Sequence, residues 1–394
     1  MISNEPIGII ELGSVKIKCI IFKINNNNLE ILSTSLSNSQ GIHNGVVVNL
    51  SKATSIIRSC ISIAEKKAEV SLKRINVIIE QPEFLSTTLS KNRKINGSKI
   101  QKDDIIFLLK EAKKQVLLND TAHSIIHIFN HNYIVDGKTF IDEPIDVYAN
   151  YLSHEMTFIT MPKNNVKNIN QVFNDCDIEV DRFISCTFAL GIHLLNNNDL
   201  KFGSILIDIG FEKTSLGLFK NLALVNSMTL PIGVNHIIKD VAKVCLLTSD
   251  ESKSVIQKID FSFLDNSKLF DRNELLIDSY FQKTSFRKIS KTLLLNVIQD
   301  RLNEILEALK KQIVLTGFDP KLGNNLYITG GGSKLINLSK YCSNFFSSEV
   351  QQIEKKQNLK ELVALEDDFM ACFGALTLIK DGWETEAIPI PSTN

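Results

Sequence analysis

One local pattern occurs twice in this chain and constrains its fold more than any other feature. An apolar run reaches Glu11, passes a turn containing Gly13, and is followed by a second apolar run that ends at Phe22. Asp208 and Gly210 occupy the same two places in the second copy, half of the 394-residue chain further on. Each copy predicts a β-hairpin with a carboxylate at its bend. The repetition favours a duplicated domain and hence two lobes of similar α/β fold.

Helical periodicity and further strands surround these hairpins. Ser51 is the expected N-cap of a helix whose apolar residues recur at helical spacing. Residues 289–314 predict a long helix in which Arg301 interrupts the apolar stripe. Residues 84–162 contain a helix and strands of their own, which indicates an inserted subdomain. The other expected elements are helices over 103–118 and 235–247 and strands over 75–79, 125–129 and 133–135.

Three glycine-containing turns are candidates for binding a nucleotide. A bend of the acid-x-Gly type turns backbone N–H groups toward an anion, and two such bends facing each other can hold phosphates from both sides. Asp208 is the expected metal residue, because a carboxylate at such a bend can hold Mg²⁺ through water. Residues 329–333 form a third turn, where three glycines let a ligand approach the backbone. The candidate nucleotide-contacting residues are Glu11, Gly13, Ser14, Lys16, Asp208, Gly210, Lys213, Gly330, Gly331, Gly332 and Ser333.

In order and spacing, these motifs resemble FtsA, the bacterial cell-division member of the superfamily of actin, hexokinase and DnaK-type chaperones. The resemblance covers nearly the whole chain, from Ile7 to about Ile379. It includes both phosphate motifs, the family's S-x-G-x-x-x-G loop, the connecting motif, the adenosine motif and the FtsA-specific insert. The matching segments are residues 11–16, 39–45, 136–137, 142–144, 208–210, 231–233 and 329–333.

The resemblance implies an actin-like, ribonuclease H-like α/β fold of two duplicated lobes with an FtsA-type inserted subdomain. Residues 1–83 and 163–200 would form the first lobe, and residues 84–162 the insert. The second lobe would contain residues 201–380, with 235–319 as its outer subdomain, and a tail of residues 381–394 would follow.

The resemblance also implies the function of a cell division adaptor rather than an enzyme. Such a protein binds ATP with Mg²⁺ in the cleft between its lobes and assembles into filaments. It links the C-terminal tail of FtsZ to the cytoplasmic face of the inner membrane and to later division proteins. Arg301 and Glu304 would lie on the face that receives the FtsZ tail. The alternative for these two residues is an intrahelical ion pair worth about 0.3 kcal/mol.

Residues 211–213 depart from the family's second phosphate loop, which reads D-I-G-G-G-T. Phe211 and Glu212 replace two glycines, and Glu212 adds a charge of the same sign as a phosphate. Lys213 can compensate as a compact positive charge. We therefore expect ATP binding with at most weak hydrolysis, and the altered loop argues against a kinase of the same superfamily. A pilus-assembly adaptor of the PilM kind is the other alternative.

Charge and hydropathy bear on the remaining classes of partner. Basic and acidic residues number 44 each, so no net charge favours nucleic acid as a partner. No signal peptide is visible and no apolar run reaches the roughly 18 residues of a membrane span, so the chain is expected in the cytoplasm. After Lys380 the tail has no basic residue, so we expect weak direct binding to anionic membranes.

Three histidines resemble a metal-binding pattern but have a simpler explanation. His123, His127 and His131 are spaced by four, as metal ligands on one helical face would be. The residues between them read as strands rather than as a helix. We therefore expect ordinary half-buried histidines at these positions.

Overall fold

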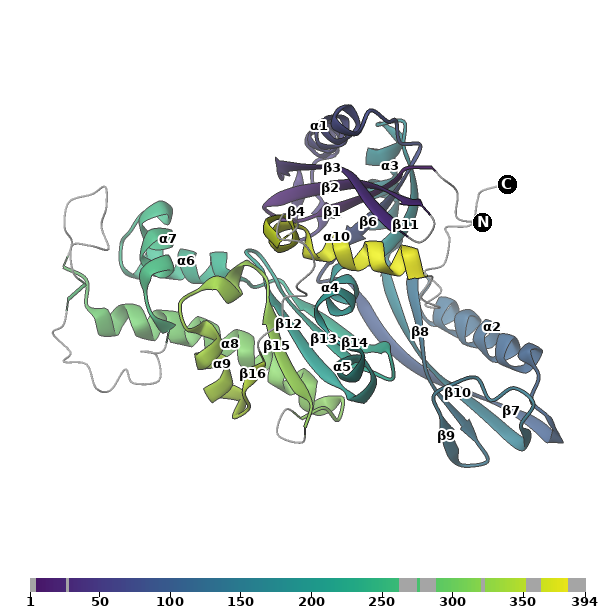
Figure 1. Ribbon diagram of the computed structural model, residues 1–394. Helices are drawn as coiled ribbons and strands as arrows, with labels where there is room; N and C mark the ends of the chain where they lie inside the picture. The colour runs from purple at the N-terminus through teal and green to yellow at the C-terminus, as the bar shows by residue number, and fades with distance from the viewer. Residues whose placement is uncertain are drawn as a thin grey trace. The chain divides into compact units, whose positions relative to one another are not determined.

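The computed structural model describes residues 5–25, 28–261, 275–276, 288–319, 323–351 and 363–381. The described residues form two compact units (Figure 1). Unit 1 comprises those within 1–203, 217–228 and 354–394, and unit 2 those within 204–216 and 229–353. Residues 382–394, on which the expectation of weak membrane binding rests, lie outside the described residues.

Unit 1 is built on a five-stranded sheet that contains the first hairpin. Strands β1 (Ile7–Leu12) and β2 (Lys16–Asn25) pair antiparallel, so the expected hairpin is confirmed. Strand β3 (Asn28–Asn38) continues it, while β6 (Arg74–Ile79) and β11 (Glu179–Ser185) run parallel on the other side. The strand order is β11-β6-β1-β2-β3. Both faces of the central strands are apolar, so both need a cover of helices.

Helices cover this sheet from both sides (Figure 1). Helix α1 (Leu50–Ala68) packs on β2 and β3, with α3 (Lys163–Asn174) beside it. Helices α4 (Cys186–Leu194) and α10 (Val363–Asp381) pack on each other, and α10 also contacts β1, β2 and β6. The short helix α5 (Asn197–Phe202) follows α4.

The start of α1 differs from the sequence prediction. The N-cap is Asn49, whose side-chain oxygen accepts a hydrogen bond from the backbone N–H of Lys52 at 2.9 Å. Ser51 lies inside the first helical turn instead. Both residue types cap well, and the extended backbone of Asn49 decides between them because only a residue outside the helix can act as the cap.

The inserted subdomain is a four-stranded antiparallel sheet with one helix on it, all within unit 1. The strand order is β7-β10-β8-β9, and α2 (Lys102–Asn119) packs against β7, β8 and β10. The two short strands expected at 125–129 and 133–135 form one continuous strand, because pairing with β10 holds them in line across two register shifts. The strand bounds are β7 Leu85–Lys99, β8 His123–Val135, β9 Lys138–Phe140 and β10 Tyr148–Pro162.

The second five-stranded sheet has the order β14-β13-β12-β15-β16. The second expected hairpin is present as β12 (Ser204–Ile209) and β13 (Thr214–Lys220). The boundary between the two units passes through β13 and β14, so each of these strands contributes residues to both. The remaining elements are β14 Ala223–Leu230, α6 Val234–Val244, α7 Ser249–Lys258, α8 Lys291–Leu315, β15 Asn325–Thr329, η4 Gly331–Lys334, α9 Leu338–Phe346 and β16 Val350–Gln351.

The buried face of α8 coincides with the predicted apolar stripe only in the second half of the helix, at Ile305, Leu309 and Ile313. Residues spaced by four drift around a helix by about 40° per step, so a long run of them leaves the buried face. Leu293 is 44% exposed, whereas Leu294 is fully buried. Arg301 therefore lies at the border of the apolar face rather than inside it. The buried residues of α8 are Leu294, Leu295, Ile298, Leu302, Ile305, Leu306, Leu309 and Ile313.

Candidate functional site

The carboxylate of the first hairpin is held by a lysine of the neighbouring strand. Glu11 lies near the end of β1, directly opposite Lys18 in β2. The Lys18 ammonium group donates to both oxygens of Glu11, at 3.0 and 2.9 Å. Lys16, the lysine that the sequence suggested for the phosphates, is exposed at the start of the strand. In this hairpin the structure therefore places Lys18, and not Lys16, beside the carboxylate.

This ion pair is largely shielded from water. The side chains of Lys18 and Glu11 are 21% and 14% exposed. Burial by itself would lower the pKa of Lys18, but the negative charge of Glu11 and its hydrogen bond outweigh burial and raise that pKa above its ordinary value. Lys18 is therefore a permanent cation, and the two charges neutralise each other.

The bend of this hairpin is tight and carries a buried hydroxyl. A methyl group at Gly13 would lie 2.5 Å from the carbonyl oxygen of Lys16. The loop after β3 contacts the same bend, since the backbone N–H of Ser39 donates to the carbonyl of Val15 at 2.8 Å. In the part of the chain that the structure describes, the buried Ser14 hydroxyl has no hydrogen-bond partner. A group with this unused capacity is available to a ligand at the bend.

The second hairpin has the same turn. The Gly210 N–H donates to the carbonyl of Lys213 at 2.9 Å, and a methyl group at Gly210 would lie 2.8 Å from that carbonyl oxygen. Gly13 stands in the same relation to Lys16 in the first hairpin. The two turns agree in geometry although their sequences differ, which supports the duplication.

The altered second loop is bound to the start of α6. The backbone N–H groups of Val234 and Asn235 donate to the carbonyls of Gly210 and Phe211, at 3.1 and 2.8 Å. The Asn235 side chain donates to Glu212 Oε1 at 2.8 Å. Two N–H groups of the helix N-terminus are thereby used by the loop itself and are not available to a phosphate.

Glu212 brings a poorly satisfied charge to this loop. Only one of its carboxylate oxygens has the contact with Asn235, and among the described residues the buried Oε2 has no hydrogen-bond partner. Lys213 is half-buried at the end of the same turn. The loop has therefore found a stable geometry without its two glycines, but it presents a carboxylate where the family presents backbone N–H groups.

The glycine turn after β15 packs directly on the second hairpin. Gly330 has a φ of 87°, and a methyl group there would lie 2.2 Å from Asp208 Oδ1, so only glycine fits. The Ser333 hydroxyl closes the turn by donating to the Gly330 carbonyl at 2.7 Å. Around Gly331, by contrast, no described residue other than its chain neighbours has an atom within 4 Å of the position of a methyl group. The turn thus has a tightly packed side and an open side, and the open side is the one accessible to a ligand.

Unit 2 therefore brings together Asp208, Gly210 and the 330–333 turn. The short helix η4 occupies 331–334, and the next helix, α9, begins at Leu338. Unit 1 holds Glu11, Gly13, Ser14 and Lys16 on one hairpin. Lys18 was missed from the sequence, because the strand register that places it opposite Glu11 is seen only in the structure.

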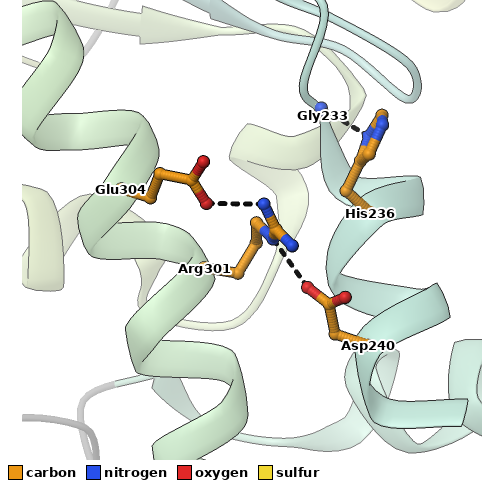
Figure 2. A network of polar contacts seen from close by, with 5 residues as sticks. All are labelled: Gly233, His236, Asp240, Arg301 and Glu304. Atoms are coloured by element: carbon orange, nitrogen blue, oxygen red, sulfur yellow. Dashed lines mark hydrogen bonds and ion pairs between the residues drawn. The ribbon is translucent and has the colours of Figure 1, made fainter. Parts of the chain in front are cut away.

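Arg301 joins two helices of unit 2 (Figure 2). Its Nε donates to Asp240 Oδ2 of α6 at 2.6 Å, and its Nη1 donates to Glu304 Oε2 one turn along α8 at 2.5 Å. The hydrogen bond to Asp240 is the main reason why the pKa of Arg301 is raised. Figure 2 also shows His236 Nδ1 accepting from the Gly233 N–H at the start of α6, at 3.2 Å. The expected intrahelical pair exists, and a second, interhelical pair accompanies it.

The histidines of β8 have structural surroundings, and His127 and His131 are buried rather than half-buried as expected, because they lie between the strands and helices packed around them. His127 accepts a hydrogen bond from the Ser185 N–H at 2.9 Å, and His131 shares one with the Thr157 hydroxyl at 2.7 Å. His123 forms an ion pair with Asp120 at 2.6 Å when protonated. In the described ranges, no group of three or more His, Cys, Asp or Glu residues has the geometry to hold a metal ion. None of the described helices is long and apolar enough to span a membrane.

Comparison with solved structures gives the fold. The chain resembles the PilM–PilN type IV pilus biogenesis complex with a TM-score of 0.62 and 11% identity, over 96% of this chain and 99% of that one. It resembles MreB5 of Spiroplasma citri bound to AMPPNP with a TM-score of 0.55 and 12% identity, over 97% and 99%. Two hairpins that carry acids at corresponding bends, with a glycine turn packed on the second, belong to an actin-like fold.

Comparison of sequences gives the family. Residues 83–160 match the model of the SHS2 domain inserted in FtsA. The cell division protein FtsA of Agrobacterium fabrum is 23% identical, over 88% of this chain and 81% of its own length. That of Borreliella burgdorferi is 26% identical over 88% and 84%, and that of Bacillus subtilis 23% over 89% and 79%. The chain is therefore similar to FtsA proteins over most of its length and contains the FtsA-type insert, and this similarity supports a role in cell division.

Proposed function

We propose that this chain is a cell division adaptor that binds ATP, assembles into actin-like filaments, and links FtsZ to the inner membrane and to later division proteins. The observation that carries the proposal is the FtsA-type insert at residues 83–160 within an actin-like chain whose relatives are named cell division proteins. The test is co-sedimentation with FtsZ in the presence of ATP, compared with FtsZ that lacks its C-terminal tail. Equal recovery with both forms would contradict the proposal.

ATP binding is proposed from the two hairpin bends and the glycine turn described above. The open side of Gly331 suits the nucleoside, and the Ser14 hydroxyl suits a phosphate oxygen. Asp208 supplies the hard oxygen atoms that Mg²⁺ prefers and would hold the ion through water. Calorimetry at millimolar ATP tests this, with Asp208→Ala expected to weaken binding and Asp181→Ala, an exposed acid on β11, as the matched control. No heat of binding in the unmodified chain would contradict the proposal.

The bound nucleotide is proposed to act as a structural ligand that is hydrolysed weakly at most. Two N–H groups at the start of α6 are occupied by the carbonyls of Gly210 and Phe211, and Glu212 adds a negative charge. Both features remove stabilisation from a phosphoryl group that gains charge in the transition state. Phosphate release measured with and without FtsZ tests this. Turnover at rates typical of kinases would overturn it.

FtsZ recognition is proposed on α8 of unit 2. A groove of about 520 Å³ is lined there by Asp300, Asn303, Glu304, Glu307, Ala308 and Lys311. Glu304 is half-exposed at this groove and is the proposed contact residue. Arg301 is held by two carboxylates, so we assign it the role of fixing α8 against α6 in addition to any contact with the tail.

Binding of the FtsZ tail peptide, measured by fluorescence polarisation, separates these roles. Glu304→Ala and Arg301→Ala should both weaken binding. Asp240→Asn removes the ion-pair partner on α6 without changing the groove. It should weaken binding only if Arg301 acts by positioning the helix. Unchanged affinity in all three variants would place the FtsZ contact elsewhere.

Membrane association is proposed to be peripheral and indirect, at the cytoplasmic face of the inner membrane. Residues 381–394 contain three acids, two prolines and no basic residue, a composition that disfavours an amphipathic helix on anionic lipid. Filament avidity, a partner or an extension outside this sequence would then supply the affinity. Flotation of the monomer with anionic liposomes should show weak binding. Strong, salt-sensitive binding that is lost on deleting residues 383–394 would refute this.

A further inference from the structure

In the first hairpin, the ammonium group of Lys18 already occupies the position that a metal ion bound by Glu11 would take. Lys18 Nζ lies 3.0 and 2.9 Å from the two oxygens of Glu11, so both oxygens are engaged by one ammonium group. The register of β1 and β2 places the two residues directly opposite each other. Opposite residues on one face of an antiparallel pair lie close enough for such contact. The pair is therefore built into the hairpin and does not depend on a chance conformation of a surface lysine.

The surroundings of Lys18 leave Glu11 as its charge partner within the hairpin. The other groups that influence Lys18 are the thiols of Cys186 and Cys372. Burial raises the pKa of the Cys372 thiol far above its ordinary value, so this thiol is neutral. With side chains only 21% and 14% exposed, separating Lys18 from Glu11 would leave a poorly hydrated charge on each.

A magnesium ion does not fit at Glu11 while this pair is intact. Mg²⁺ requires ligand oxygens at about 2.0–2.1 Å in octahedral geometry and keeps several waters. The ammonium group of Lys18 occupies the space in front of both carboxylate oxygens. Two cations in that space would repel each other strongly, because the site is largely shielded from water. Glu11 can serve a metal only if Lys18 leaves.

We propose that Lys18 is the built-in counter-cation of the first phosphate hairpin: it neutralises Glu11, so that a nucleoside triphosphate approaches this hairpin without a metal ion bound to it. The proposal rests on nucleotide binding as proposed above and specifies how this hairpin tolerates a polyphosphate beside a glutamate. Any Mg²⁺ that accompanies the nucleotide takes no ligand from Glu11. Lys16 has no part in this arrangement.

The alternative is that the pair only stabilises the hairpin. The two explanations differ in what Mg²⁺ does once Lys18 is removed. If Lys18 stands in place of a divalent cation, then uncovering Glu11 should make the protein respond to Mg²⁺. If the pair is only structural, removal of Lys18 should weaken the fold without creating any response to the ion.

The first measurement is thermal unfolding of the full chain without nucleotide, in the absence of Mg²⁺ and at about 10 mM Mg²⁺. A concentration of this order is needed to occupy a single weak carboxylate site. Lys18→Met should melt lower than the unmodified chain and should regain part of the loss with Mg²⁺. The unmodified chain, Lys16→Met and the double variant Glu11→Gln/Lys18→Met should show no such gain. An equal effect of Mg²⁺ on Lys18→Met and on the double variant would overturn the proposal.

The second measurement is the ratio of the dissociation constants of a fluorescent ATP analogue in EDTA and in Mg²⁺. Lys18→Met should raise this ratio about tenfold or more, because the exposed carboxylate then repels the phosphates unless the metal neutralises it. Lys18→Arg and Glu11→Gln/Lys18→Met should keep the original ratio. An unchanged ratio in Lys18→Met would overturn the proposal. If no form binds the analogue, nucleotide binding itself is wrong, and the thermal measurement still decides the role of Lys18.

Discussion

Mild acid should destabilise the inserted subdomain through histidines that are buried in neutral form. His154 is fully buried, stacks on Tyr133 with 4.3 Å between ring centroids, and has no hydrogen-bond partner for either ring nitrogen among the described residues. Burial lowers the pKa of His154 and of its neighbour His131 from 6.5 to about 4. Neither ring can accept a proton in the folded state without being charged in a nearly dry environment.

The direction and size of the effect follow from these pKa values. The unfolded chain binds a proton at each histidine below about pH 6.5, whereas the folded chain does so only near pH 4. The stabilisation that each neutral histidine contributes is therefore fully present above pH 6.5 and is lost as the pH falls toward 4. At pH 5 each histidine should cost about 2 kcal/mol of unfolding free energy relative to pH 7.5. This is a large part of the 5–15 kcal/mol or so that stabilises an ordinary domain.

Urea unfolding followed by circular dichroism at pH 7.5, 6 and 5 measures this loss. His154→Phe keeps the aromatic stacking on Tyr133 and removes the titrating group. Between pH 7.5 and 5 its free energy of unfolding should therefore fall by about 2 kcal/mol less than that of the unmodified chain. His43→Gln, at an exposed position, is the control and should follow the unmodified chain. If His154→Phe loses as much stability between pH 7.5 and 5 as the unmodified chain does, the reasoning is refuted.

Three further experiments test the packing of the fold and of the candidate site. Gly330→Ala should destabilise unit 2 by about 1–3 kcal/mol from its left-handed backbone alone, and it should abolish nucleotide binding. Gly331→Ala should fold normally, and thermal melting and ATP titration compare the two variants. Gly374→Ala should destabilise unit 1 by several kcal/mol, on the order of other overpacked cores, because the added methyl group would lie 1.8 Å from a carbonyl oxygen of α4. An unchanged melting temperature would contradict the close packing of α4 and α10. Arg301→Ala and Asp240→Asn should each lower the free energy of unfolding by about 0.2–1 kcal/mol. In a double-mutant cycle the two losses should not be additive, since additive losses would mean that the two side chains do not interact.

The sequence was sufficient to predict the elements that local patterns specify. Both hairpins, the helices now labelled α1, α2, α6 and α8, and the separate character of residues 84–162 appear in the structure close to the expected bounds. Each rests on alternation or helical periodicity among residues close together in the chain, and such patterns need no knowledge of distant partners. The acid-x-Gly bends and the glycine turn carried enough order and spacing to indicate the FtsA family.

Only the tertiary structure decided which partner each functional side chain has. Lys16 and Lys18 are equally plausible in sequence, and the strand register selects Lys18 for Glu11. The contact of the altered 211–213 loop with α6 joins residues more than 20 positions apart, and that of Arg301 with Asp240 spans 61. Charged and polar side chains obtain their partners from strands and helices that packing brings together. Local periodicity determines which elements form, whereas the pairing of their side chains depends on how the apolar faces of those elements are buried against each other.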